Sequence, residues 1–169
     1  MTSQLTGAGR RATRQGPDAT RIRRATASDA RRLTALVRRS RAYEGRYAPM
    51  VAGYRVGPDY IETHPVFTAV DADDTVLGFY ALLLSPPELD LMFVSDAAQG
   101  LGIGRRLIRH LTGEARAAGI PAVRIVSHPP AEGFYLGMGA RRTGTVRANP
   151  PAVPWDRPEL LLPITQPDP

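Results

Sequence analysis

Apolar residues spaced three or four positions apart predict three helices along this chain. In the first, Leu33 and Val37 fall on one face, and Thr26 followed by Asp29 resembles a capping box at the helix start. Glycines open the second helix, and prolines open the third. The three helices are expected over residues 27–40, 102–118 and 130–138.

Runs rich in β-branched and aromatic residues predict strands between and after these helices. Residues 41–64 are less periodic and hold four tyrosines among glycine and proline breakers, which predicts short helical turns and loops that can line a pocket. The strands are expected over residues 22–24, 66–70, 75–84, 89–94, 122–127, 140–146 and 159–164. This order predicts an α+β fold with a mixed, largely antiparallel sheet of about six to seven strands flanked by helices.

The chain length of 169 residues fits one domain with a sizeable core. Residues 1–20 contain almost no large apolar side chain, so we expect a flexible tail there. The folded domain is expected over residues 21–165, and residues 166–169 form a second short tail. The chain has no cysteine and only three scattered histidines, so we expect neither a disulfide framework nor a metal site.

The net charge of +6 comes from arginine alone, because all 22 cationic residues are Arg. This usage is typical of a GC-rich, bacterial-like genome, so the charge is weak evidence for a polyanionic partner. Twelve of these arginines lie in residues 1–50, so a nucleic-acid site would have to lie there, and we do not expect one. No run approaches 18 apolar residues and no signal peptide precedes the domain, which favours a cytoplasmic protein without membrane contact.

A glycine loop between a strand and a helix predicts an anion site. Gly100, Gly102 and Gly104 follow the strand at 89–94 and open the helix at 102–118. The first turn of a helix presents unpaired N–H groups at the positive end of its dipole, and glycines allow a diphosphate to approach closely. A dinucleotide fingerprint would need a different glycine spacing inside a βαβ unit, so that reading is rejected.

Two motifs resemble those of the GNAT superfamily of N-acetyltransferases. The first is the Gln99-x-x-Gly102-x-Gly104 pattern after the strand at 89–94, which resembles the acetyl-CoA signature of that family. The second has Tyr135 and Gly139 seven and eleven residues after His128, at offsets where the family commonly has Tyr and Gly after an Asn. His128 departs from that Asn, and we interpret it as a strand-end residue. The resemblance covers about residues 22–164.

The resemblance implies that acetyl-CoA binds between two splayed central strands, at 89–94 and 122–127. Pantetheine would bond to the backbone of Met92 and Val94 as an added strand does, and the pyrophosphate would rest on the N–H groups of residues 99–105. The expected cofactor-binding residues are Met92, Phe93, Val94, Gln99, Gly100, Leu101, Gly102, Ile103, Gly104 and Arg105.

The implied chemistry is attack of a neutral amine on the thioester carbonyl, which needs an oxyanion donor, a base and an acid. The Val94 N–H is the expected oxyanion donor. Tyr135 is the candidate acid because a phenol is protonated at neutral pH. Asp90 is the candidate base, and Glu88 is the second choice.

The acceptor amine is expected between the tyrosine-rich segment and the loop at residues 149–155. The expected contacts come from Tyr43, Tyr47, Tyr54 and Trp155, whose rings can stack on a ligand or hold a cation. The favoured acceptor is a small-molecule primary amine, acetylated by direct transfer. A protein N-terminus, a lysine side chain, or an aminoacyl-tRNA as another donor stay as alternatives. The oligomeric state is open, with a homodimer as one option.

Overall fold

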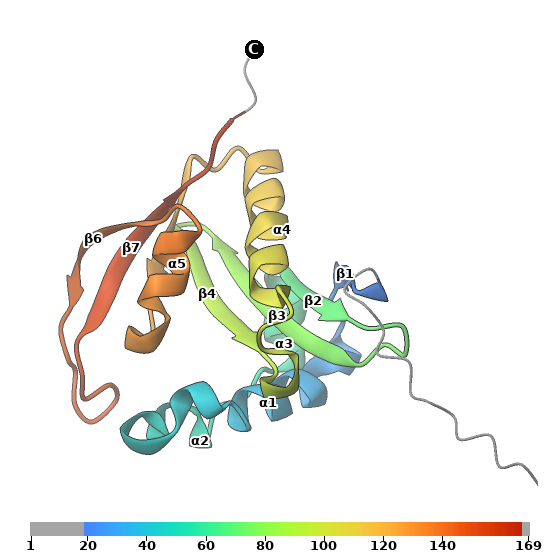
Figure 1. The fold of residues 1–169 in the computed structure, drawn as a ribbon, viewed down its shortest axis with the longest axis horizontal. Coiled ribbons are helices and arrows are strands. Elements are labelled where there is room, and N and C mark those ends of the chain that lie inside the picture. The colour runs from blue at the N-terminus through green and yellow to red at the C-terminus, as the bar shows by residue number, and fades with distance from the viewer. Residues whose placement is uncertain (1–18, 167–169) are drawn as a thin grey trace, which may run out of the picture.

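The computed structural model describes residues 19–166, so the expected tails lie almost wholly outside the described part. Its centre is a seven-stranded sheet with strand order β1-β2-β3-β4-β5-β7-β6 (Figure 1). Only the pair β4 and β5 is parallel, and the other neighbours are antiparallel. The strands are β1 (Arg21–Arg24), β2 (Val66–Val70), β3 (Val76–Leu84), β4 (Pro87–Val94), β5 (Ala122–Val126), β6 (Arg141–Val146) and β7 (Arg157–Pro163).

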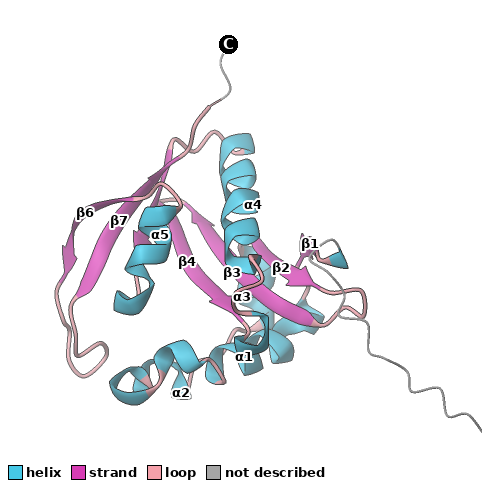
Figure 2. Cartoon of the chain, viewed as in Figure 1, coloured by secondary structure: helices cyan, strands magenta, loops and turns pink. Residues whose placement is uncertain are grey.

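Helices cover both faces of this sheet (Figure 2). Short 3-10 turns precede several of them, including η3 (Arg41–Tyr43) and η4 (Gly45–Tyr47) in the tyrosine-rich segment. The α-helices are α1 (Ala30–Arg38), α2 (Pro49–Ala52), α3 (Pro58–Thr63), α4 (Ile103–Ala117) and α5 (Glu132–Gly137). The predicted α+β class, with a mixed and largely antiparallel sheet, is confirmed.

The structure changes the predicted boundaries at three elements. The Thr26 and Asp29 capping box is present, but the first turn is a 3-10 helix and α1 begins only at Ala30. The third predicted helix likewise starts as a 3-10 turn over Pro129–Ala131, and α5 itself begins only at Glu132. The last strand is shifted to Arg157–Pro163.

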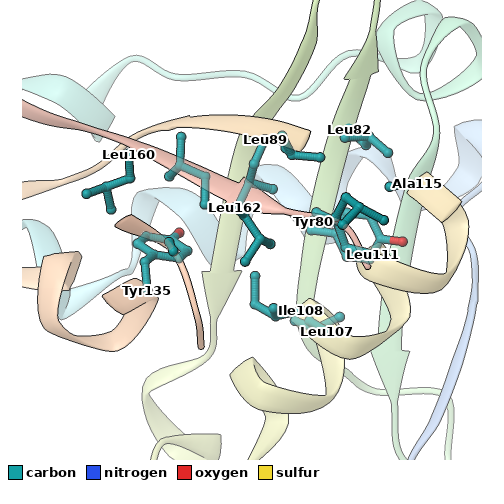
Figure 3. Packing of buried hydrophobic residues seen from close by; sticks show 14 of the residues in the cluster. Tyr80, Leu82, Leu89, Leu107, Ile108, Leu111, Ala115, Tyr135, Leu160 and Leu162 are labelled. Atoms are coloured by element: carbon teal, nitrogen blue, oxygen red, sulfur yellow. The ribbon is translucent and has the colours of Figure 1, made fainter. Parts of the chain in front are cut away.

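The larger apolar core lies between the sheet and the helices α4 and α5 (Figure 3). Leu107, Ile108 and Leu111 of α4 are almost completely buried against β3, β4 and β5. Gly78 allows this close approach, because a Cβ there would lie 2.9 Å from the Phe93 carbonyl oxygen and 3.2 Å from the Leu107 side chain. The start of α4 therefore packs directly against β3, beside the end of β4.

A second core fills the opposite face of the sheet. It joins Leu33 and Val37 of α1 and Ile61 of α3 to Phe79 and Phe93. Adjacent residues of a strand point to opposite faces, so β3 and β4 supply side chains to both cores. The two central strands are thereby fixed from both sides.

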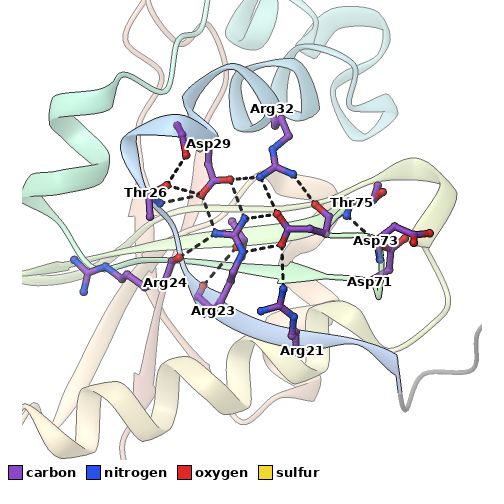
Figure 4. Close-up of polar contacts among 12 residues, drawn as sticks. Arg21, Arg23, Arg24, Thr26, Asp29, Arg32, Asp71, Asp73 and Thr75 are labelled. Atoms are coloured by element: carbon purple, nitrogen blue, oxygen red, sulfur yellow. Dashed lines mark hydrogen bonds and ion pairs between the residues drawn. The ribbon is translucent and has the colours of Figure 1, made fainter.

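The described arginines near the start of the domain form an internal ion-pair network (Figure 4). Asp29 is 1% exposed and accepts two hydrogen bonds of 2.9 Å from the Arg23 guanidinium. Arg32 also pairs with Asp29, and both arginines reach Asp74 in the hairpin between β2 and β3. These arginines therefore tie β1 and α1 to the hairpin.

None of the helices within residues 19–166 is both long enough and apolar enough to cross a lipid bilayer.

Candidate active site

The sheet opens in its middle because β4 and β5 pair at two positions only. Glu88 pairs with Arg124 and Leu89 with Ile125, and the two strands then diverge. A cavity of about 660 Å³ lies along the divergence. The predicted splayed pair is therefore present, and the cavity extends from it toward the glycine loop on one side and the tyrosine-rich segment on the other.

The edge of β4 that faces this opening carries the backbone groups of Met92 and Val94. Ser95 donates its N–H to Leu77 on β3, and neighbouring residues of a strand direct their N–H groups to opposite sides. The groups of Phe93 therefore face β3, and those of Met92 and Val94 face away from it. The Val94 carbonyl accepts a hydrogen bond of 3.1 Å from the Gln99 side-chain amide and keeps its second lone pair.

Asp90 occupies a bulge in β4. Leu89 pairs with Leu82 and Leu91 with the adjacent Ala81, so Asp90 is the extra residue of the pair. Asp90 lines the cavity, and its carboxylate accepts a short hydrogen bond from the Tyr60 hydroxyl of α3. A regular strand would put Asp90 on the same face as Met92, two residues on, and away from α3.

Glu88, the second candidate base, also lines the cavity. Its carboxylate lies 3.4 Å from the Arg124 guanidinium, which also pairs with Glu159. The charge of Glu88 is thereby balanced at the closed end of the seam, whereas Asp90 is held by a neutral phenol.

The glycine loop has the geometry of an anion site at the start of α4. Gly102 has a φ of 78°, a left-handed conformation that favours glycine, and it caps the helix. The N–H groups of Ile103, Gly104 and Arg105 take no backbone partner among the described residues, as expected of a first helical turn. This backbone fits a diphosphate, with Arg105 exposed beside it.

Tyr135, the candidate acid, lies on α5 beside the opening. It is 8% exposed, lines the cavity and packs in the larger core. Burial raises the pKa of its phenol well above the ordinary value of about 10, and the nearby Tyr43 raises it further. Tyr135 therefore holds its proton throughout the neutral range.

Aromatic contacts close the side of the cavity that lies at the tyrosine-rich segment. The rings of Tyr43 and His128 stack with their centroids 3.9 Å apart, and His128 Nε2 lies 2.6 Å from the Ala42 carbonyl oxygen. The ring of Tyr47 makes T-shaped contacts with the rings of His128 and Trp155, at centroid distances of 4.5 Å and 4.8 Å. The segment before α2 and the loop before β7 thus meet each other across the end of β5.

Most of the predicted site residues line one cavity. Tyr43, Tyr54 and Trp155 lie in its wall together with the predicted catalytic pair. Tyr47 and Leu101 do not line it. Tyr47 packs edge-on against Trp155, and Leu101 is exposed, so their predicted ligand contacts stay predictions.

His128 and Arg157 are among the cavity residues that the sequence reasoning missed. His128 was interpreted as a plain strand-end residue, but it lines the cavity through its stack on Tyr43. Arg157, at the start of β7, also lines it. Pairing of β7 with β5 brings Arg157 to this place, and no local pattern in the sequence signals that pairing.

A sheet split at a parallel pair, with a glycine loop at the mouth of the gap, places this protein among the acyltransferases. Residues 58–150 match the acetyltransferase (GNAT) domain family, and the chain belongs to that family.

Known relatives agree with this membership. The chain is 27% identical over 151 residues to a peptidyl-lysine N-acetyltransferase, YjaB, of Salmonella typhimurium. This match covers 84% of this chain and 97% of the relative. Its fold is similar to that of a phosphinothricin acetyltransferase from Sinorhizobium meliloti solved with acetyl-CoA, with a TM-score of 0.65 and 22% identity over 86% of this chain and 89% of that one. It is also similar to the Escherichia coli ribosomal-protein-S18-alanine N-acetyltransferase, with a TM-score of 0.66 and 18% identity over 88% and 96% of the two chains.

Proposed function

We propose that this protein transfers an acetyl group from acetyl-CoA directly to a small-molecule primary amine. The observation that carries the choice of a small acceptor is the contact between Tyr47 and Trp155. These rings join the two segments that flank the acceptor side of the cavity, which favours a short ligand over an extended peptide.

Acetyl-CoA, when bound, supplies the activated acetyl group. The unpaired N–H groups at the start of α4 would hold its pyrophosphate, and the free edge of β4 at Met92 and Val94 would hold its pantetheine amides. Gly104 supports this arrangement, since a Cβ there would lie 3.2 Å from the Phe134 ring and 3.5 Å from the Met92 side chain, both in the cavity wall.

The chain's own residues would move two protons. Asp90 would accept a proton from the amine, directly or through water, because its carboxylate lies in the cavity wall where the strands diverge. Tyr135 would donate a proton to the leaving sulfur, because burial keeps its phenol neutral. The Val94 N–H faces the opening and would donate to the carbonyl oxygen as negative charge develops on it.

A lysine side chain of a peptide is the second candidate acceptor, favoured by the similarity to the peptidyl-lysine N-acetyltransferase of Salmonella typhimurium. A lysine side chain is itself a thin primary amine, so it can enter a cavity whose rim excludes the peptide backbone. The two candidates therefore differ at the rim of the cavity, which would contact a peptide backbone in one case and no further part of the acceptor in the other.

The test is a CoA-release assay with acetyl-CoA and two panels of acceptors, small primary amines and lysine-containing peptides. We expect kcat/KM to be at least about tenfold higher for the best small amine than for any peptide. A Tyr47→Ala variant, which removes the contact with Trp155, should raise the KM of the small amine. Higher turnover of peptides by the unaltered protein would overturn the proposal of a small acceptor.

A further inference from the structure

Several residues of the cavity wall carry a buried polar atom without a partner. Four buried side-chain polar atoms lack a hydrogen-bond partner within residues 19–166. Three of them, His128 Nδ1, Trp155 Nε1 and Arg157 Nε, belong to residues that line the cavity. The fourth, on Glu132, lies 3.3 Å from the Arg142 guanidinium. Buried polar groups in proteins are nearly always paired, so this cluster indicates a ligand.

Trp155 and Arg157 contribute hydrogen-bond donors only. Trp155 is 8% exposed, and its indole N–H has no partner although it is buried. Leaving such a donor unpaired carries a desolvation penalty that a bound acceptor atom would remove. The Nε–H of Arg157 is also buried without a partner and is a charged donor of the same kind.

The charge of Arg157 is uncompensated inside the described part of the protein, where no ion pair or side-chain hydrogen bond joins it to another residue. By contrast, the two carboxylates of the cavity wall are already engaged, Glu88 by Arg124 and Asp90 by Tyr60. The ring of Tyr43 lies near enough to Arg157 for the positive charge to counter part of the effect of burial on its phenol, whose pKa is raised to about 12.

Strand pairing sets these charges on opposite sides of the opening. Asp90 follows the last paired residue of β4. Arg157 starts β7, and its neighbour Pro158 accepts a 2.9 Å hydrogen bond from Ser127 at the end of β5. The cavity therefore has a carboxylate on the β4 side and an unpaired cation with an indole donor on the β7 side.

We infer that the acceptor is an amine that also carries a carboxylate, as an amino acid does. The carboxylate would be held by the Arg157 guanidinium and the Trp155 N–H, and the amine would lie toward Asp90. This inference rests on the proposed function and narrows its substrate to one chemical class.

His128 has a different part in the same wall. Its Nε2 donates to the Ala42 carbonyl, and burial lowers the pKa of the ring, so the imidazole is neutral and Nδ1 is an acceptor. Nδ1 therefore does not add to the donors for a carboxylate. It places an acceptor, without a positive charge, beside the predicted path of the amine.

The experiment compares free amino acids with their carboxamides as acceptors, in the full-length protein with acetyl-CoA. Each pair differs only in whether the acidic group is present. We expect kcat/KM to be about tenfold or more higher for the best acid than for its amide. Arg157→Gln should lower kcat/KM for the acid by roughly 10- to 100-fold, as expected for a charge-assisted hydrogen bond, and change the amide and the donor KM little.

The matched control is Arg147→Gln. Arg147 lies just after β6 in the loop before β7, is 82% exposed and pairs with Asp156, outside the cavity wall. This variant should keep the preference for acids. Equal use of acids and amides, or an equal loss on both in Arg157→Gln, would overturn the inference. Turnover of amines without an acidic group, and of no amino acid, would overturn it and leave the proposed function intact.

A binding readout separates the two failures. Thermal unfolding is measured with saturating CoA and each amino acid in millimolar excess. A rise in melting temperature with an amino acid, absent in Arg157→Gln, supports the carboxylate site even where no acetyl transfer occurs and the proposed function has failed. No rise with any amino acid, together with no turnover of one, counts against the site itself.

Discussion

The Tyr60 hydroxyl donates a hydrogen bond to the Asp90 carboxylate, joining α3 to the bulge of β4. The bond fixes the carboxylate at the point where β4 and β5 diverge. Burial raises the pKa of the Tyr60 phenol well above its ordinary value, and the hydrogen bond to the charged Asp90 raises it further. This donor therefore keeps its proton at neutral pH. The predicted base is thus positioned by a residue that does not compete for protons.

Asp90→Asn should lower kcat by about 10²-fold or more, because an amide cannot accept the proton of the amine. Glu88→Gln is the matched comparison, since Glu88 lines the same cavity but is balanced by Arg124. We expect it to lower kcat much less. Steady-state kinetics with the best acceptor measures both. A larger loss in the Glu88 variant would move the role of base to Glu88.

Tyr135→Phe should keep the fold and the binding of acetyl-CoA, because the ring and its packing in the larger core remain. The variant loses the proton for the leaving sulfur, so kcat should fall by about 10²-fold while the donor KM changes little. Because the pKa of Tyr135 is raised by burial, its deprotonation should not limit the wild-type rate up to about pH 10. An unchanged kcat would mean that the thiolate leaves unprotonated or through water.

CoA should raise the melting temperature of the protein, because a ligand that binds only the folded state stabilises it, by about 2.7 kcal/mol at a hundred times its Kd. Gly102→Asp should remove this shift by placing a negative charge at the anion site. The control is Gly119→Asp, which adds the same charge at a left-handed glycine, with a φ of 71°, beyond the other end of α4. A CoA shift of wild-type size in Gly102→Asp would show that the loop is only a turn.

Asp29→Asn should destabilise the protein by about 3 kcal/mol at pH 7, since it leaves the Arg23 charge short of a buried partner. The hydrogen bonds from Arg23 hold the pKa of Asp29 well below its usual range. The stabilisation from these bonds is therefore complete above about pH 4, which is the pKa of Asp29 in the unfolded chain. It is lost as the pH falls through the lower pKa that Asp29 has in the folded protein. Thermal unfolding between pH 2 and 7 should show a flatter acid limb in Asp29→Asn, whereas Asp73→Asn on the exposed hairpin should match wild type.

The elements and the glycine-loop side of the cavity could be predicted because their signals are local. The glycine loop is contiguous in the chain, and Tyr135 lies at a fixed offset from His128 and Gly139. The helix cap at Thr26 is equally local, and the structure contains it. Such features depend on a few neighbouring residues, so a single sequence is enough to find them.

The other side of the cavity, where we propose that the acceptor binds, could not be predicted with the same detail, because it depends on tertiary pairing. The bulge that turns Asp90 toward α3 is set by the register of β4 on β3, and no residue type marks it. Arg157 reaches the cavity through the pairing of β7 with β5. His128 gains its place from a ring on a segment about 85 residues earlier, which alternation and propensity do not encode.

The short pairing of β4 with β5 also has a mechanical consequence for the whole molecule. Within residues 19–166, two paired positions are the only ladder that joins strands β1 to β4 with strands β5 to β7. A donor lying between the strands would bond to one half of the sheet while it packs on the other. The affinity for the donor and the stability of the contact between the two halves of the sheet are then coupled. A substitution that weakens the pairing of β4 with β5, even far from the glycine loop, therefore also lowers the affinity for the donor.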